Sequence, residues 1–393
     1  MNDTRECLPL QGIRVVEAAS GVAGPLAACR LGDLGADVFK MEWDRGDWLR
    51  TCPPLMGDGT GSAFFGLNRG KRSVYLGSDA QSEPGLFKRL VEAADVFITD
   101  QSTDQLRALG LAGADADLCA WNPRLVVAQI SALGKHGPLA DRPGSELTAQ
   151  AMAGYTRYVG TAGQPSVRLG ADVAGCATGI FTGQAVLAAL YARGRSGCGQ
   201  RVDLSLLNSL LSMKTVHLAA QSDPDTFEGP RVGGAYDPPE RGWATRDAPV
   251  TFAFGGAVGA EGRPGWTKFV EAMGLSHMLN DPRYDKNGRL TTGLGPRARE
   301  LKAEYEAGFM NWSAADVVAR VREFGGFASA YLTHAQLMQE PQVASLGLVR
   351  QVATHGAAVP VLDFPARFSG MRTRLEGVAP RLGEHTREVA GAA

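Results

Sequence analysis

The sequence predicts an α/β protein whose larger domain is doubly wound around a parallel sheet and whose smaller domain is α+β. Short apolar runs alternate with segments of helical periodicity through residues 13–133, as expected for a parallel sheet. The 50 glycines show no repeat, which is typical of many tight turns rather than of a low-complexity chain. A stretch rich in Pro, Gly and Asp, residues 222–248, then interrupts the pattern and predicts a linker or a functional loop.

The first elements form a βαβ unit. Residues 13–17 are predicted to form a buried strand, residues 24–36 have helical spacing, and residues 37–43 form a second strand. Pro25 lies in the first turn of the helix, where its missing N–H does no harm. The alternation continues with three further strands, at residues 72–76, 95–99 and 124–133. A helix at residues 83–94 separates the first two of them.

The pattern becomes helical from about Ser145 to residue 221. A new α+β unit begins at residues 249–258 and ends near residue 330, after which short strands and polar turns return. We therefore predict a large domain built from residues 1–225 and 331–393, with a small domain, residues 226–330, inserted into it.

Composition excludes several classes of protein. The net charge is −1, from 40 basic and 41 acidic side chains, which argues against nucleic-acid partners and anionic membranes. The longest clear apolar run, residues 185–190, is well short of the ~18 residues expected of a membrane span. The N-terminus lacks the features of a secretory signal, and the six cysteines are scattered without a metal-binding pair. These observations predict a cytoplasmic protein without a metal site.

Two segments partly match nucleotide-binding motifs. The turn "SGVAGP" with Glu42 after the second strand suggests a dinucleotide site, but the motif GxGxxG is not there. The segment "GLNRGKRS" has one residue too few for a phosphate-binding loop, and Arg72 stands where Ser or Thr is needed. Lys71 and Arg72 can still bind phosphates, or they can form a solvated basic turn.

Asp172 is the most distinctive carboxylate, because it precedes an almost uncharged helical segment with glycines at 175, 179 and 183. It is either a helix N-cap or a nucleophile that the helix dipole keeps ionised. The glycines would let another backbone or a slim ligand approach the helix closely. Cys176, in apolar surroundings, is predicted to be an inert core thiol.

At this point a family resemblance becomes clear. The segments "LQGIRVVEAASGVAGPLAACRLGDLGADVFKME", "LNRGKRSVYL", "WNPRLVVAQISALGKHGPLADRPG" and "ADVAGCATGIFTGQAVLAALYARGRSGCGQRVDLSLLNSLL" resemble, in this order, the family III CoA-transferases, also called the CaiB/BaiF family. The resemblance continues through "LNDPRYDKNGRL", "PQVASLGLV" and "LGEHTREV", so it covers nearly the whole chain.

The resemblance implies that Asp172 is the essential aspartate of a CoA-transferase. It would attack an acyl-CoA thioester, form an anhydride and then an aspartyl-CoA thioester, and pass CoA to a second carboxylic acid. It implies a Rossmann-like large domain, an interlocked homodimer, and acyl-CoA as a substrate with no tightly bound cofactor and no metal. The CoA contacts implied are Gly21, Val22, Ala23, Lys71, Arg72 and Arg107.

Some positions depart from the family pattern. Thr99-Asp100-Gln101 replaces the Glu-Asn of many relatives, and the glycine-rich lid is reduced to Gly233 and Gly234, the predicted lid and oxyanion residues. Two alternatives stay open. One is a 2-methylacyl-CoA racemase, although Ser145 stands where racemases carry a basic histidine. The other is a non-catalytic relative that binds acyl-CoA.

The acyl group is not identified by the sequence. Aromatic side chains at 236, 243, 252 and 254 suit either a bulky acyl pocket or a core, and Arg231 or Arg241 suits a second carboxylate or solvent.

Overall fold

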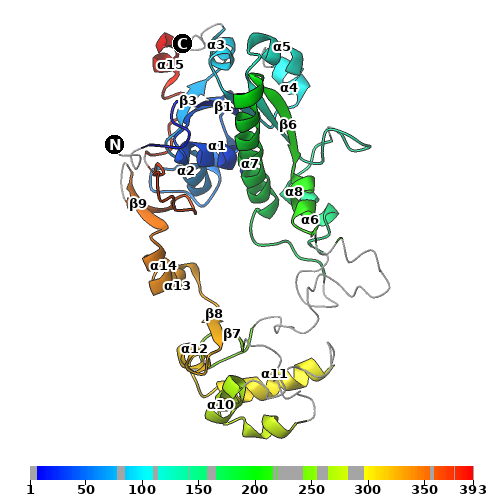
Figure 1. The fold of residues 1–393 in the computed structure, drawn as a ribbon, viewed down its shortest axis with the longest axis vertical. Helices are drawn as coiled ribbons and strands as arrows, with labels where there is room; N and C mark the ends of the chain where they lie inside the picture. Colours follow the sequence, from blue (N-terminus) through cyan, green and yellow to red (C-terminus); the bar gives the residue numbers. More distant parts are fainter. Residues whose placement is uncertain are drawn as a thin grey trace. The chain divides into compact units, whose positions relative to one another are not determined.

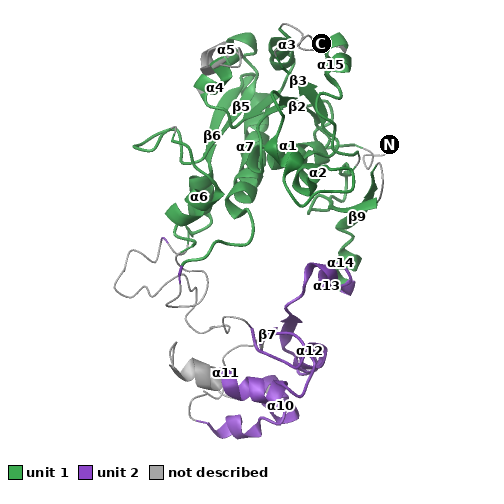
Figure 2. Ribbon diagram, turned by 180° about the vertical axis from the view of Figure 1, so that it is seen from behind, with its two compact units in different colours: residues 1–159, 166–215, 342–393 green, residues 160–165, 216–341 purple. Residues whose placement is uncertain are grey.

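The computed structural model divides the chain into two compact units, residues 1–159, 166–215 and 342–393, and residues 160–165 and 216–341 (Figure 2). The predicted small domain, residues 226–330, falls inside the second unit. The residues that the structure describes are 7–77, 85–108, 114–140, 142–156, 165–215, 218, 242–254, 264–281, 296–354, 358–375 and 377–392.

Unit 1 contains a six-stranded sheet in which every pair of neighbours is parallel (Figure 1). The strand order is β3-β2-β1-β4-β5-β6, so strands are added first on one side of β1 and then on the other. The topological switch point therefore lies between β1 and β4. The strands are β1 (Arg14–Ala18), β2 (Asp37–Glu42), β3 (Arg72–Tyr75), β4 (Val96–Thr99), β5 (Val126–Ser131) and β6 (Gln200–Ser205). The predicted α/β class with a parallel sheet is confirmed.

The prediction that residues 145–221 are helical throughout was wrong at β6. In this strand Arg201 and Asp203 alternate with Val202 and Leu204. This alternation is typical of an edge strand with one face exposed to solvent. The strand is bounded by α7 (Val173–Ser196) and α8 (Leu206–Ser212), so its short alternation was hidden between two helical patterns.

Helices cover both faces of the sheet because successive strand residues point to opposite sides. Val15 and Val126 belong to the core that includes α1 (Ala23–Asp33) and α7. Val16 and Val127 belong to the core on the other face. Four helices contribute to that second core, α3 (Leu86–Glu92), α4 (Thr103–Ala108), α5 (Ala114–Trp121) and α15 (Thr386–Ala392).

The C-terminal tail closes the free edge of β3. The N–H of Gly383 donates to Ser73 Oγ at 2.9 Å, and the N–H of Tyr75 donates to Thr386 Oγ1 at 2.9 Å. Arg50 Nη1 also donates to the carbonyl oxygen of Pro380 at 2.9 Å. Before this tail, β9 (Val349–Ala353) and β10 (Ala358–Leu362) form an antiparallel pair. The edge is therefore protected from pairing with another chain.

Unit 2 has its own aromatic core. Its strands β7 (Val250–Ala253) and β8 (Phe327–Ala330) are antiparallel, and Phe252 and Phe254 are buried beside Trp243. Phe252 and Phe254 are therefore core residues of unit 2, and the partly buried Trp243 packs against that core. The helices are α10 (Pro264–Ala272), α11 (Pro296–Phe309), α12 (Ala314–Glu323) and α13 (His334–Leu337), with the 3-10 turn η4 (Ser276–Asn280). The predicted loop residues 231, 233, 234, 236 and 241 lie outside the described residues.

Helix α7 corrects the expectation that no segment is long and apolar enough to cross a membrane. Its 24 residues include an 18-residue window of mean hydropathy 1.6, and half of that window is buried within the fold. It packs against α1, β5, β6 and α8 as a core helix does. The expectation failed because glycine and threonine interrupt the apolar runs without adding charge.

Glycines bring the first turns of α7 against α1. A Cβ atom at Gly175 would lie 2.9 Å from Val22 Cβ, and one at Gly179 would lie 2.8 Å from the Ala23 carbonyl oxygen. At Gly183 no atom lies within 4 Å of that position. The glycine face is therefore a tight helix contact over its first two positions only.

This difference predicts opposite effects of the same substitution on stability. Gly179→Ala forces α1 and α7 apart and lowers the free energy of unfolding by about 1–3 kcal/mol. Gly183→Ala adds a good helix former in open space and raises it by about 0.5–1 kcal/mol. Urea unfolding of both variants measures the two changes. Equal destabilisation by the two alanines would contradict the packing described.

Candidate functional site

A cavity of unit 1 opens at the carboxyl ends of the parallel strands. Its volume is about 730 Å³, a size suited to a small-molecule ligand. It lies beside the point where the strand order reverses, the usual ligand position in such sheets. The lining residues come from the carboxyl ends of strands, from the loops that follow them and from the starts of helices. They are residues 20–24, 48, 100, 102, 105, 130–132, 135, 142–144, 146, 172, 175 and 206.

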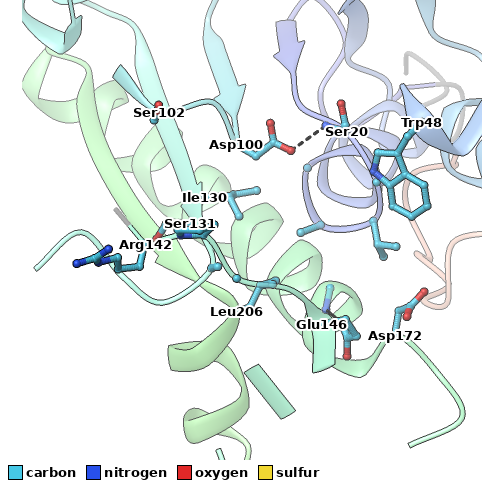
Figure 3. Close-up of a pocket in the computed structure, with 18 of the residues that line it drawn as sticks. Ser20, Trp48, Asp100, Ser102, Ile130, Ser131, Arg142, Glu146, Asp172 and Leu206 are labelled. Carbon is cyan, nitrogen blue, oxygen red and sulfur yellow. Dashed lines mark hydrogen bonds between the residues drawn. The ribbon is translucent and has the colours of Figure 1, made fainter. Parts of the chain in front are cut away.

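The turn between β1 and α1 forms one wall of this cavity. Gly21 has φ 75°, a conformation that favours glycine, and its N–H donates to Asp47 Oδ1 at 3.1 Å. The N–H of Ser20 donates to Asp100 Oδ2 at 2.9 Å (Figure 3). Trp48, on the 3-10 turn η2 (Trp48–Thr51), lies against Gly21, where a Cβ would come within 3.2 Å of the indole. Two carboxylates and an indole thus fix the turn.

A buried charge network supports the turn from below. Lys40 Nζ lies 2.8 Å from Glu17 Oε1 and 2.9 Å from Asp47 Oδ2, and all three side chains are buried. Lys71 Nζ lies 2.6 Å from Glu17 Oε2. Burial lowers the pKa of Lys40, but Glu17 and Asp47 outweigh it and hold that pKa above its ordinary value. Burial lowers the pKa of Lys71, and the nearby Lys40 lowers it further.

Asp172 lies at the N-cap position of α7 but does not cap the helix, since its carboxylate makes no bond to the first-turn amides. Glu146, on helix α6 (Glu146–Met152), caps α7 instead. Its Oε1 accepts the N–H of Ala174 and its Oε2 accepts the N–H of Gly175, both at 2.8 Å. The carboxylate of Asp172 therefore remains available at the cavity wall, 45% exposed and beside Glu146 (Figure 3).

Gln150 and Arg168 hold the chain before Asp172. Gln150 Nε2 donates to Glu146 Oε1 at 2.7 Å and to the Ala171 carbonyl oxygen at 3.3 Å. Gln150 Oε1 accepts the N–H of Leu169 at 3.1 Å. Arg168 Nη2 forms a direct ion pair with Asp172 Oδ1. One helix, α6, thus positions both the helix start and the segment that carries the carboxylate.

The structure brings together four of the residues predicted from the sequence. Gly21, Val22, Ala23 and Asp172 line the same cavity. The predicted lid residues Gly233 and Gly234 lie outside the described residues.

The three predicted basic contacts do not line this cavity. Lys71 is buried, and its ammonium group donates to Glu17, Asn68 and the Pro25 carbonyl oxygen. Arg72 pairs with Asp37 and Glu388, and Arg107 with Asp104. Their contacts with CoA stay a prediction.

Several cavity residues were not selected from the sequence. Trp48, Lys135 and Arg142 line the cavity from loops, and nothing in their local spacing indicates it. Glu146 could have been chosen as an acid in the first turn of a helix, but the helix that it caps begins 27 residues later in the sequence. Arg142 lies on the Ser131 side of the cavity, across the view from Asp172 (Figure 3).

The structure also places two other side chains that the sequence singled out, Cys176 and Glu42. Cys176 is exposed, so the prediction of a core thiol was wrong, because the apolar residues around it in sequence point to other sides of α7. Its partial burial, together with Asp172 and Glu146, raises the pKa of the thiol. Glu42 binds Arg50 through two bonds of 2.8 and 2.6 Å and accepts from Ser73 Oγ at 2.7 Å, so it serves the fold. Among the described residues, no group of three or more His, Cys, Asp or Glu is placed to hold a metal ion.

Asp100 is the cavity carboxylate with the most perturbed titration. Burial raises its pKa from 3.8 to about 6, and the bond from Ser20 and the charge of Lys40 only partly oppose that rise, while Asp47 adds to it. A raised native pKa means that the folded protein retains a proton that the unfolded chain has lost. The ionised carboxylate therefore destabilises the fold above about pH 6, and the cost is absent below about pH 4.

Asp100→Asn removes this charge and keeps an oxygen that can accept from Ser20. We expect the variant to be more stable than the parent at about pH 8, by up to about 3 kcal/mol, with the difference vanishing near pH 4. Urea unfolding across this pH range measures it. Asp104→Asn, at a side chain 91% exposed, is the control and should track the parent. A constant difference at every pH would contradict the assignment.

Comparison with known proteins agrees with this geometry. The family model described as CoA-transferase family III matches residues 10–386. A succinate–glutarate CoA-transferase of Agrobacterium fabrum is 30% identical and aligns over 97% of this chain and 94% of the relative. A formyl-CoA:oxalate CoA-transferase of Streptomyces avermitilis is 28% identical over 97% of this chain and 94% of its own length.

A solved structure gives the same result. The crystal structure of a CaiB/BaiF family protein from Brucella suis superimposes with a TM-score of 0.83 at 28% identity, covering 98% of this chain and 99% of that chain. Because the family model spans nearly the whole sequence and both curated relatives align end to end, this chain belongs to CoA-transferase family III.

Proposed function

We propose that the protein transfers CoA from an acyl-CoA thioester to a carboxylic acid, with Asp172 as the covalent nucleophile. The observation that carries this proposal is that one carboxylate caps helix α7 while the carboxylate at the N-cap position does not. Glu146 satisfies the amides at the start of α7, and Asp172, at the N-cap position, is left beside the cavity without a capping bond. The carboxylate, and not the protonated acid, is the form that attacks.

The reaction needs four attacks and no proton transfer. The Asp172 carboxylate attacks the thioester carbon, and CoA leaves as a thiolate, giving an aspartyl acyl anhydride. The thiolate attacks the aspartyl carbonyl carbon and releases the first acid as a carboxylate, giving an aspartyl-CoA thioester. The second acid repeats the two steps in reverse order, so that its own acyl-CoA leaves and the Asp172 carboxylate is restored.

The proposed CoA position is the turn at Gly21, Val22 and Ala23. Val22 faces Gly175 so closely that a Cβ on the glycine would lie 2.9 Å from Val22 Cβ. The turn and the start of α7 therefore form one continuous wall, and a thioester held on the turn reaches the helix start where Asp172 lies. Backbone amides of a turn and a helix start can stabilise the oxyanion that each attack forms.

Racemase chemistry gains no support from the site. It requires bases on both faces of the α-carbon. Ser145, at the position where a racemase would carry a basic side chain, accepts the N–H of Thr148 at 3.3 Å as the N-cap of α6. The hydroxyl of Ser145 does not act as a base near neutral pH. Transfer through a carboxylate is the function that the geometry supports best.

Asp172→Ala should abolish turnover and leave CoA binding within about threefold of the parent, because the capping of α7 belongs to Glu146. The protein is incubated with acetyl-, succinyl-, branched and aromatic CoA esters, with succinate, glutarate and oxalate as first acceptors, and quenched with hydroxylamine. Mass spectrometry then locates the hydroxamate, which we expect on Asp172. Quenching of Trp48 fluorescence, compared with Trp48→Phe, reports binding.

Three results of this experiment would contradict the proposal. Turnover by Asp172→Ala, or a hydroxamate on another residue, removes Asp172 as the nucleophile. Incorporation of deuterium at the acyl α-carbon in heavy water, without a hydroxamate, indicates a racemase. CoA binding with neither reaction across the panel of esters indicates a binding protein.

We also propose that the protein is a homodimer in which α7 takes part. Ile180, Leu187 and Tyr191 are 60%, 38% and 66% exposed, and their spacing puts them on one face of this helix. Apolar side chains gathered on one helix face are a common feature of interfaces.

Ile180→Glu should convert a species of twice 41.5 kDa into one of 41.5 kDa, because it places a charge in the buried interface. Light scattering after size-exclusion chromatography measures the mass. Lys88→Glu, at a side chain 52% exposed on α3, is the control and should remain dimeric. A parent protein of monomeric mass, or a dimeric Ile180→Glu variant, would remove this proposal.

A further inference from the structure

The ion pair between Arg168 and Asp172 sets this carboxylate apart from the other acids of the cavity. Arg168 Nη2 contacts Asp172 Oδ1, and the two side chains are 51% and 45% exposed. Glu146 accepts from the amides of Gln150, Ala174 and Gly175, and Asp100 accepts from Ser20 and Gln101. In the described part of the site, the proposed nucleophile is thus the carboxylate that a guanidinium holds directly.

The proposed reaction removes the charge of Asp172. In both the anhydride and the aspartyl-CoA thioester the aspartyl group is neutral, so Arg168 loses its partner in both states. A substrate acid carries a carboxylate of its own, first as the released acid and then as the incoming acid. A guanidinium binds either carboxylate with the same planar geometry.

The structure keeps Arg168 in place for this exchange. The backbone on its C-terminal side is held by Gln150, which accepts from the N–H of Leu169 at 3.1 Å and donates to the Ala171 carbonyl oxygen at 3.3 Å. The side chain is half exposed and can be reached by a ligand. A guanidinium has five N–H donors, so an acid can bind beside the aspartyl group without a large movement of Arg168.

We propose that Arg168 is the carboxylate-binding residue for the substrate acid, paired with Asp172 in the resting protein and with the acid while Asp172 is acylated. This inference rests on the proposed function. One oxygen of the acid binds Arg168, and the other attacks the aspartyl carbonyl carbon of the thioester. The carbon–sulfur bond breaks, CoA leaves as a thiolate with the bonding electron pair, and an anhydride forms. No proton moves, and Arg168 keeps its charge throughout.

A neutral nucleophile, hydroxylamine, distinguishes binding of the substrate carboxylate by Arg168 from a purely structural role of Arg168. Hydroxylamine attacks acylated Asp172 without a carboxylate, so it does not need Arg168. For Arg168→Gln we expect kcat/KM for the acceptor acid to fall about 10- to 150-fold, the loss expected from a charged hydrogen-bonded contact. The rate of hydroxamate formation on Asp172 and the Kd for CoA should stay within about threefold of the parent.

Two further variants sharpen the test. Arg168→Lys keeps the charge but not the planar fork, so its loss with the acid should be intermediate. Arg320→Gln removes another exposed arginine, which pairs with Glu323 at 2.9 Å in unit 2, and should behave as the parent in every assay.

The outcomes distinguish this inference from the proposed function. If the parent forms no hydroxamate on Asp172, the proposed function fails and this inference fails with it. If the parent forms it and Arg168→Gln uses the acid normally, only the role of Arg168 is overturned. If acid transfer and hydroxamate formation fall together, Arg168 merely positions Asp172, and the carboxylate-binding role is again overturned.

Discussion

The capping of α7 by Glu146 is the interaction on which the candidate site depends. A helix start leaves amides without partners, and an aspartate at the N-cap position ordinarily binds them. Here the two oxygens of Glu146 accept the amides of Ala174 and Gly175 from another helix. Asp172, at the N-cap position, makes no capping bond and lines the cavity instead. A capped helix start and an exposed carboxylate are thereby obtained at one place in the chain.

The same division between supporting and exposed charges occurs under the first turn. Glu17, Lys40, Asp47 and Lys71 are buried and bind one another, and they fix a backbone turn whose glycines face the cavity. Removing one member of such a buried network would leave an unpaired charge behind, which is far more costly than losing a surface pair. The network therefore gives the cavity wall a single geometry.

The parallel sheet could be predicted because short apolar runs, as at residues 125–128, repeat between helical patterns. Asp172 could be singled out because it precedes an uncharged helix. The positions of Lys71 and Glu146 could not be predicted from local sequence. The burial of Lys71 depends on Glu17, which is 54 residues away, and Glu146 acts on a helix that begins 27 residues later. Local residue spacing predicts where a helix or strand forms, whereas the hydrogen-bond and ion-pair partners of Lys71 and Glu146 depend on the assembled fold.

The C-terminal tail that closes β3 has a consequence for how the protein is made. Ser73, Tyr75 and Arg50 find their partners at Gly383, Thr386 and Pro380. During synthesis the sheet of unit 1 is translated long before these partners leave the ribosome, so its β3 edge stays open while all of unit 2 is being made. An open edge can pair with another nascent chain. Completion of unit 1 is thus a late event, and in the interval before it the edge of β3 is open to pairing with another chain.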